Sequence, residues 1–158
     1  MKKGNPGMTL IKRDSLSCAT GTMGASIEVA LGLGIGEAAR ILAVDINVYS
    51  KLITSGEIHR THGGYSFDLD DNDLDVLMAN DDVFALVSAG AAFITDGGAN
   101  TGQSRMLDFS RMNLITTRNV KMLVQHCGTG SIGYCDAAIY YEKFTPTTNE
   151  MVELLSRR

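Results

Sequence analysis

The sequence has little of the material that many protein classes require. Its 158 residues include no Trp, two Pro and three Cys, and aromatic residues make up 6% of the chain. The odd number of cysteines gives no disulfide framework, although one bridge stays open, with Cys127 and Cys135 nearest in sequence. No apolar run reaches the roughly 18–20 residues that cross a bilayer. Any core must therefore rest on aliphatic residues and Met.

The N-terminus lacks the apolar segment of a secretory signal. Lys2 and Lys3 are followed by Gly, Asn and Pro instead. We therefore expect a protein that is not secreted by a signal peptide, kept in a reducing compartment such as the cytoplasm, and without a membrane partner.

Charge is distributed unevenly along the chain. The cations Lys2, Lys3, Lys12 and Arg13 outweigh Asp14, so the first fourteen residues carry +3 within a chain of net charge −4. These four cations are candidates for contact with nucleic acid. Four charges neutralise too few phosphates to bind tightly unless many copies act together, and an ordinary solvated terminus is the alternative.

Abundant glycine with scarce proline favours tight turns between strands. We expect residues 1–24 to form an irregular basic arm and residues 25–158 to form one domain. Alternating apolar residues predict strands at 27–35, 40–49, 106–109, 114–117, 119–127 and 132–144, with one bent strand or two short ones in 83–95. Gly-rich segments at 50–66 and 96–103 are expected to be loops. About eight strands predict a mainly β, antiparallel sandwich of the jelly-roll kind, or a barrel.

A short internal helix is expected after the acidic stretch 68–75. Leu74, Leu77 and Met78 have helical spacing there and follow good N-cap residues.

A second helix is predicted at residues 147–157. Thr147 and Glu150 fit a capping box, and an apolar stripe at i, i+3 and i+4 follows. At about ten residues this helix is too short to be stable alone, so the stripe must pack on its own sheet or on a neighbouring subunit. The stripe supplies the candidate interface residues Met151, Leu154 and Leu155.

The segment Gly34–Ala39 matches G-x-G-x-x-A, a pattern that binds dinucleotides when a helix follows it. Residues 40–48 instead alternate like a strand, and Asp45 comes too early to contact a ribose. A glycine-lined strand or bend is the preferred interpretation, and no cofactor is predicted.

Asp68, Asp70 and Asn72 match three positions of a calcium-binding loop. Asp73 stands where that loop needs Gly, and Ala79 stands where it needs a bidentate Glu, so an EF-hand is excluded. The first three residues remain weak candidates for a looser metal contact, against a solvated acidic turn.

A zinc site is a further hypothesis. His59, His62, His126, Cys127 and Cys135 are ligand types, but their spacing matches no zinc signature. His126 and Cys127 also point to opposite faces of one strand. No nucleophile motif accompanies the Ser, Cys or His residues, so we predict no catalytic residue.

The order of elements resembles that of small viral or virus-like coat proteins with a jelly-roll or related β-sandwich. The nearest motif is Ala138–Leu155, AIYYEKFTPTTNEMVELL, an alternating strand that leads into an S/T-x-x-E-capped helix. The weakly basic arm departs from coats that condense genomes with dense Arg/Lys arms.

The resemblance implies a structural, non-enzymatic subunit that self-assembles into a homo-oligomeric shell and resides in a virion. Its partner would be itself, with packaged nucleic acid through the arm. Three alternatives stay open. A soluble sandwich or barrel would bind a ligand or partner in a concave pocket. A metal-dependent β-barrel enzyme would use His59, His62 and His126. A nucleotide-dependent oxidoreductase would need residues 37–43 to be helical, which we do not expect.

Overall fold

The structure is a computed structural model that describes residues 7–18, 24–52, 59–69, 82–91, 101–127 and 131–156. The described strands and helix are β1 (Leu10–Cys18), β2 (Gly24–Val29), β3 (Ala38–Leu52), β4 (His59–Ser66), β5 (Val83–Ala91), β6 (Thr101–Asp108), β7 (Leu114–Thr116), β8 (Val120–Cys127), β9 (Ser131–Phe144) and α1 (Thr148–Ser156).

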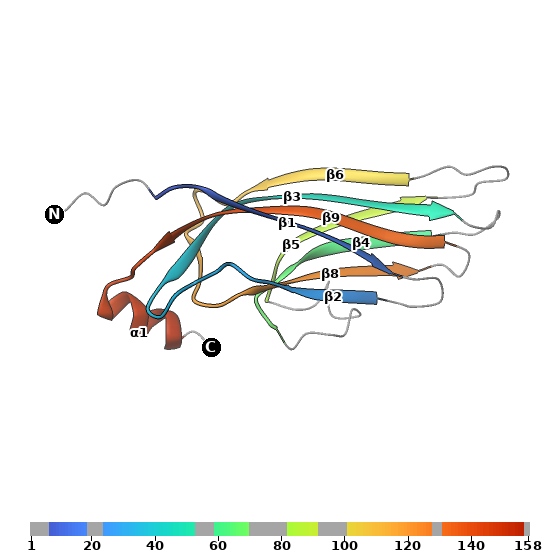
Figure 1. Cartoon of the computed structure of the whole chain (residues 1–158). Helices are drawn as coiled ribbons and strands as arrows, with labels where there is room; N and C mark the ends of the chain where they lie inside the picture. The colour runs from blue at the N-terminus through green and yellow to red at the C-terminus, as the bar shows by residue number, and fades with distance from the viewer. Residues whose placement is uncertain are drawn as a thin grey trace.

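The strands form two antiparallel sheets that face each other (Figure 1). The first sheet has the order β1-β9-β3-β6, with β7 also paired to β3, and the second has the order β2-β8-β4-β5. Pairing is nested, because β1 joins β9, β2 joins β8, β3 joins β6 and β4 joins β5. This is a long hairpin rolled up into two sheets, the arrangement of a jelly roll. The predicted antiparallel β-sandwich is confirmed.

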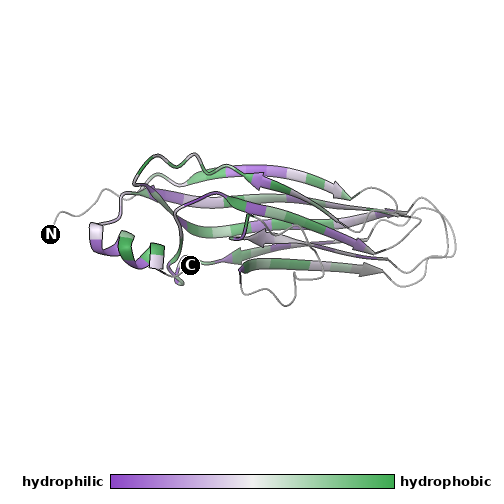
Figure 2. Cartoon of the chain, turned by 90° about the horizontal axis from the view of Figure 1, so that it is seen from below, coloured by the Kyte–Doolittle hydropathy of each residue, from purple (hydrophilic) through white to green (hydrophobic). Residues whose placement is uncertain are grey.

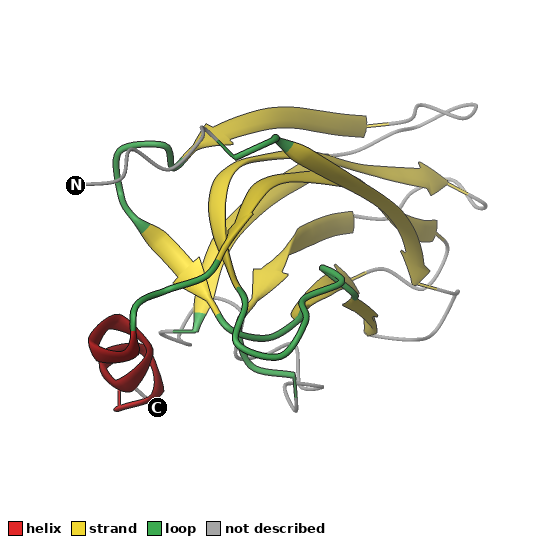
Figure 3. Ribbon diagram, turned by 60° about the vertical axis from the view of Figure 1, so that its left-hand side comes forward, coloured by secondary structure: helices red, strands yellow, loops and turns green. Residues whose placement is uncertain are grey.

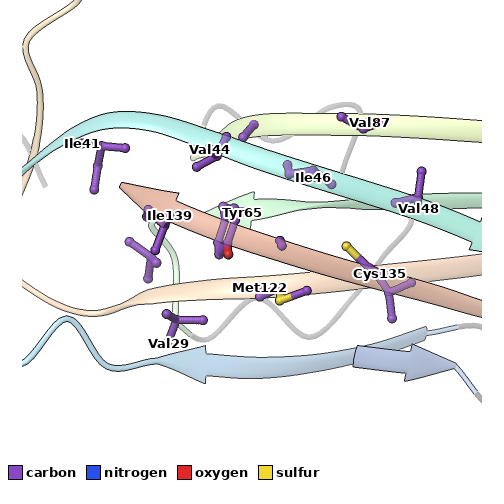
Figure 4. Packing of buried hydrophobic residues seen from close by; sticks show 14 of the residues in the cluster. Val29, Ile41, Val44, Ile46, Val48, Tyr65, Val87, Met122, Cys135 and Ile139 are labelled. Atoms are coloured by element: carbon purple, nitrogen blue, oxygen red, sulfur yellow. The ribbon is translucent and has the colours of Figure 1, made fainter. Parts of the chain in front are cut away.

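The core lies between the inner faces of the two sheets. On β3, Val44, Ile46 and Val48 are fully buried, and they alternate with half-buried residues as a one-sided strand requires. Tyr65 on β4 and Met122 on β8 face them from the second sheet (Figure 4). With no Trp available, aliphatic side chains fill most of this space, which contributes about 1.5–3 kcal/mol for each large side chain buried.

Two glycines let the sheets approach closely. A Cβ at Gly63 on β4 would lie 2.4 Å from Cys135 Sγ and 2.5 Å from Val48 Cγ1 of the opposite sheet. A Cβ at Gly133 on β9 would lie 2.7 Å from Cβ of His126 on β8. Each sheet thus has a bare backbone position where the other presents a side chain, and the two sheets interlock.

A buried chain of hydrogen bonds also joins the sheets. Ser50 Oγ on β3 lies 2.7 Å from Thr61 Oγ1 on β4, which lies 2.9 Å from Nδ1 of His126 on β8. All three residues are buried. Their polar atoms satisfy one another, which removes the cost of burying them unpaired.

The expectation of an irregular arm over 1–24 is wrong for nine of its residues, which form β1. Leu10, Lys12, Asp14 and Leu16 occupy its less exposed side, and fully buried Cys18 ends it. Because Lys12 and Asp14 lie on that side, the sequence shows no apolar alternation that would predict the strand. β1 is an edge strand, where charged side chains are tolerated and blunt unwanted pairing.

The expected loop at 50–66 is also wrong, because β3 extends through its beginning and β4 occupies its end. β4 contains Gly63 and Gly64 and no aliphatic residue, so it lacks the usual strand signal. Hydrogen bonding to β8 on one side and β5 on the other forms the strand regardless.

The single strand expected at 27–35 is wrong beyond Val29. Residues 30–37 connect β2 to β3, and positive φ angles at Gly32 (65°) and Gly36 (77°) turn the backbone. Of the glycine-lined strand or bend expected at Gly34–Ala39, the structure has the bend, and β3 begins after it at Ala38.

The remaining predicted elements agree with the structure where it describes them. The strands expected at 40–49, 106–109, 114–117, 119–127 and 132–144 correspond to β3, β6, β7, β8 and β9, and 83–95 contains β5. β6 begins earlier than expected, within the predicted loop 96–103. The helix expected at Leu74–Met78 lies outside the described residues.

Gly63→Ala should lower the free energy of unfolding by about 1–3 kcal/mol, because the new methyl group would overpack the interface between the sheets. Urea denaturation followed by circular dichroism measures this change.

Gly34→Ala is the matched control, since a Cβ there first meets the flexible end of Glu37, at 3.2 Å. Equal stability of the two variants would contradict the interlocking of the sheets.

Candidate functional site

The helix α1 begins with the predicted capping box. Thr147 N donates to Glu150 Oε2 at 2.7 Å, and Glu150 N donates to Thr147 Oγ1 at 3.4 Å. The hydrogen bond from the backbone of Thr147, then that from its side chain, and the charge of Arg40 hold the pKa of the Glu150 carboxyl below its usual value, against a small opposing effect of desolvation. The capping box fixes where the helix starts and how it leaves β9.

The helix extends from one end of the sandwich and does not lie flat on a sheet (Figure 3). None of its described residues is fully buried. Met151 and Leu154 are half-buried against the chain's own surface, whereas Val152 is 62% exposed and Leu155 46% exposed. Hydrophobic and hydrophilic residues alternate along the helix (Figure 2), and its apolar side is partly exposed at Val152 and Leu155.

A groove separates the helix from the end of the sandwich. It has a volume of about 550 Å³ and is lined by side chains from β3, β7, β9, α1 and the corners at Phe67–Asp68 and Asp82. Its lining includes Arg40, Phe144 and Leu154. Sequence reasoning did not single out Arg40, whose only signal is a cation at the first position of the strand expected at 40–49.

Two exposed apolar side chains lie on the outer face of the first sheet. Ile11 on β1 is 48% exposed and Met106 on β6 is 61% exposed. Strand registers place Tyr140, Ala138 and Ala43 on the same face between them, and Asp45 lies there too, beside Ala138 and Met106. We call Ile11, Met106, Tyr140, Ala138 and Ala43 the sheet-face patch.

The candidate metal residues are only partly described. Asp68 lines the groove, whereas Asp70 and Asn72 lie outside the described residues. Within the part of the chain that the structure describes, no group of three or more His, Cys, Asp or Glu is placed to hold a metal ion.

The histidines do not converge. His126 points into the core and contacts Thr61, whereas His62 Nδ1 on the other face of β4 lies 2.6 Å from Ser88 Oγ. Burial and then the nearby Arg60 charge lower the pKa of His62, so its neutral form is favoured. The side chain of His59 lies outside the described part. His62 and His126 face opposite ways, so they cannot both bind the zinc ion of that hypothesis.

Cys18 and Cys135 are buried and Cys135 forms no disulfide, so the bridge between Cys127 and Cys135 is excluded. Burial, and then the charge of Asp136, raise the pKa of Cys135 to about 12. A thiol with this pKa is a poor nucleophile at neutral pH, because the thiolate is the reactive form.

The dinucleotide-binding pattern forms a tight turn. Glu37 N donates to Gly34 O at 3.1 Å, and Gly34 N donates to Glu37 Oε2 at 2.7 Å. β3 follows at Ala38 in place of a helix, as the alternation at 40–48 predicted.

The candidate nucleic-acid contacts are split. Lys12 and Arg13 lie on β1, where Lys12 is half-buried and Arg13 is exposed, and Lys2 and Lys3 lie outside the described residues. Nucleic-acid contact stays a prediction. Among the described elements, no helix is long and apolar enough to span a membrane.

No protein-family model and no curated protein matches the chain. Similar solved structures include dimeric latent PorU from Porphyromonas gingivalis, with a TM-score of 0.44 and 10% identity over 90% of this chain and 14% of that chain. They also include the Gx strain of infectious bursal disease virus (TM-score 0.31, 9% identity, 87% of this chain, 37% of that chain) and the T13 particle of this virus (0.30, 9%, 85%, 35%). The chain spans well under half the length of each. These distant likenesses assign neither a family nor a function.

Cys135 should resist thiol reagents in the folded chain. With a pKa of about 12, roughly one molecule in ten thousand carries the thiolate at pH 8. In a Cys18→Ala/Cys127→Ala background, modification should be at least about 100-fold slower than in urea.

The raised pKa of Cys135 also makes the free energy of unfolding depend on pH. Because the pKa of the folded state lies above that of the unfolded chain, the thiol favours folding below about pH 8.5, and this contribution is lost as pH rises toward 12. Rapid modification of the native chain would show that Cys135 is accessible and ionised.

Proposed function

We propose that this protein is a structural subunit that self-associates into a large homo-oligomeric assembly of the shell type, with α1 as the element that reaches a neighbour. The observation that carries the proposal is that α1 is capped and amphipathic, yet has no fully buried residue. A nine-residue helix is marginal by itself in water, so packing of its uncovered apolar side would stabilise it.

The occupant proposed for this apolar side is a second copy of the chain. Val152 and Leu155 would pack on the sheet-face patch of the neighbour, where Ile11 and Met106 are exposed. Burial of these four side chains would supply about 25 cal/mol for each Å² of apolar surface removed from water. A single contact of this size is weak, but many copies acting together give a stable assembly.

The positions of the two surfaces determine the kind of assembly. The helix lies at one end of the sandwich, and the sheet-face patch lies on the side of the first sheet. A contact between two different surfaces is heterologous, and repetition of it generates rings, shells or filaments rather than a closed two-fold dimer. The jelly roll supplies a rigid body for such contacts, although the same fold serves capsid, lectin and cupin domains.

The wild-type chain should elute as a large oligomer in size-exclusion chromatography with light scattering, and negative-stain microscopy should show uniform particles. Val152→Asp/Leu155→Asp should give monomers of 16.9 kDa, because the contact would bury unpaired carboxylates. A monodisperse wild-type monomer would refute the proposal.

Met8→Asp/Ile27→Asp is the matched control, since it replaces two exposed apolar residues outside both surfaces and should leave the oligomer intact. Ile11→Asp/Met106→Asp should also give monomers. Mixing it with the helix variant should give dimers only, because each partner then retains one working surface. Failure to form these dimers would contradict the heterologous geometry.

A further inference from the structure

The groove beside α1 has the size and the mixed lining of a small-molecule site. Its volume of about 550 Å³ lies within the range of ligand pockets. Four apolar side chains form much of its wall, and charged side chains stand at the same surface. The apolar residues are Phe67, Ile115, Phe144 and Leu154.

Arg40 places a charged guanidinium at this groove, and its Nε atom makes no hydrogen bond. Three buried side-chain polar atoms among the described residues make no hydrogen bond, namely Asp14 Oδ2, Tyr65 Oη and Arg40 Nε. Of these three residues, Arg40 is the one that lines the groove. Arg40 Nε is itself buried, so a ligand in the groove would meet the guanidinium at its Nη atoms.

The fold holds the Arg40 guanidinium in place. Its neighbours Ala39 and Ile41 are fully buried, which fixes this end of β3. The guanidinium carbon lies 5.1 Å from the centroid of the Phe144 ring, a cation–π contact across the β3–β9 pair. A guanidinium packed against a ring is pre-oriented, and its two Nη–H groups can bind a carboxylate through two parallel hydrogen bonds.

The surrounding charges limit which anion can bind. Asp68, Asp82, Glu150 and Glu153 line the groove together with Arg40 and Arg118. Glu150 Oε2 already accepts hydrogen bonds from the backbone N–H and the hydroxyl of Thr147. Four acids would repel a phosphate dianion more strongly than a monoanion. The four acids outnumber the two arginines, so an anion is attracted only at the arginines, and one with a single charge and an apolar body is repelled least.

We propose that the groove binds a molecule with a single carboxylate on an apolar body, with Arg40 as the carboxylate anchor and Phe144 and Leu154 against the apolar part. The source of the carboxylate is either a small organic acid or the C-terminal residue of a hydrophobic peptide. The site does not depend on self-association, because Val152 and Leu155 do not line the groove.

The test is titration of the full chain with 3-phenylpropionate and with its neutral amide, followed by amide chemical shifts in NMR. The carboxylate should bind saturably below about 10 mM, and the amide should bind at least about tenfold more weakly, as expected for the loss of charge-assisted hydrogen bonds. Arg40→Met, which keeps the aliphatic stem, should abolish this preference. Arg40→Lys should restore part of it.

Arg105→Met on β6 is the matched control, since Arg105 is an exposed arginine of the same sheet that does not line the groove. A free acetylated Gly-Phe dipeptide and its C-terminal amide form the second arm. Tighter binding of the dipeptide than of the free acid identifies a chain end, and the reverse identifies a small acid; either supports the site. Equal binding of acid and amide, or an unchanged preference in a folded Arg40→Met variant, would overturn it.

The Val152→Asp/Leu155→Asp monomer separates this proposal from self-association. It should bind 3-phenylpropionate as the wild type does, because its groove is intact. Loss of carboxylate binding in this monomer, with binding retained by the oligomer, would overturn a site built within one chain.

Discussion

The structure depends on how closely its two sheets can approach. At Gly63 the space of a Cβ is taken by Cys135 and Val48, and at Gly133 it is taken by His126. The hydrogen bonds that link Ser50, Thr61 and His126 cross the same region. Interlocked side chains fix the spacing of the sheets, and the buried polar chain disfavours sliding, since a shift would leave polar groups unpaired.

In a closely packed sandwich of this kind, the groups that can bind a neighbour or a ligand lie at the ends and on the outer faces. Cysteine and histidine are often reactive residue types. Cys135 and His126 are buried in the core, however, where their role is structural. By contrast, α1 and Arg40 belong to the end of the sandwich, where an apolar helix side is uncovered and a guanidinium donor is unpaired. Association with a neighbour and binding of a carboxylate are therefore both proposed at that end.

Strands whose inward positions are aliphatic could be predicted from the sequence. β3 could be predicted from the alternation of Val44, Ile46 and Val48 alone. The capping box at Thr147 likewise predicted the start of α1. β1 and β4 could not be predicted in the same way. β1 has charged residues at inward-facing edge positions. β4 contains two adjacent glycines, of which Gly63 faces the opposing sheet and Gly64 lies against the backbone of β5. Their strand structure comes from neighbours distant in sequence.

The sequence by itself determined the fold class and the capped terminal helix, because apolar alternation and capping act over a few neighbouring residues. Only the tertiary structure decided the nested pairing and the opposite facing of His62 and His126. It also decided the groove at Arg40 and the half-covered side of α1. These features arise from contacts between residues far apart in the chain, and their geometry depends on where the rolled hairpin brings each strand.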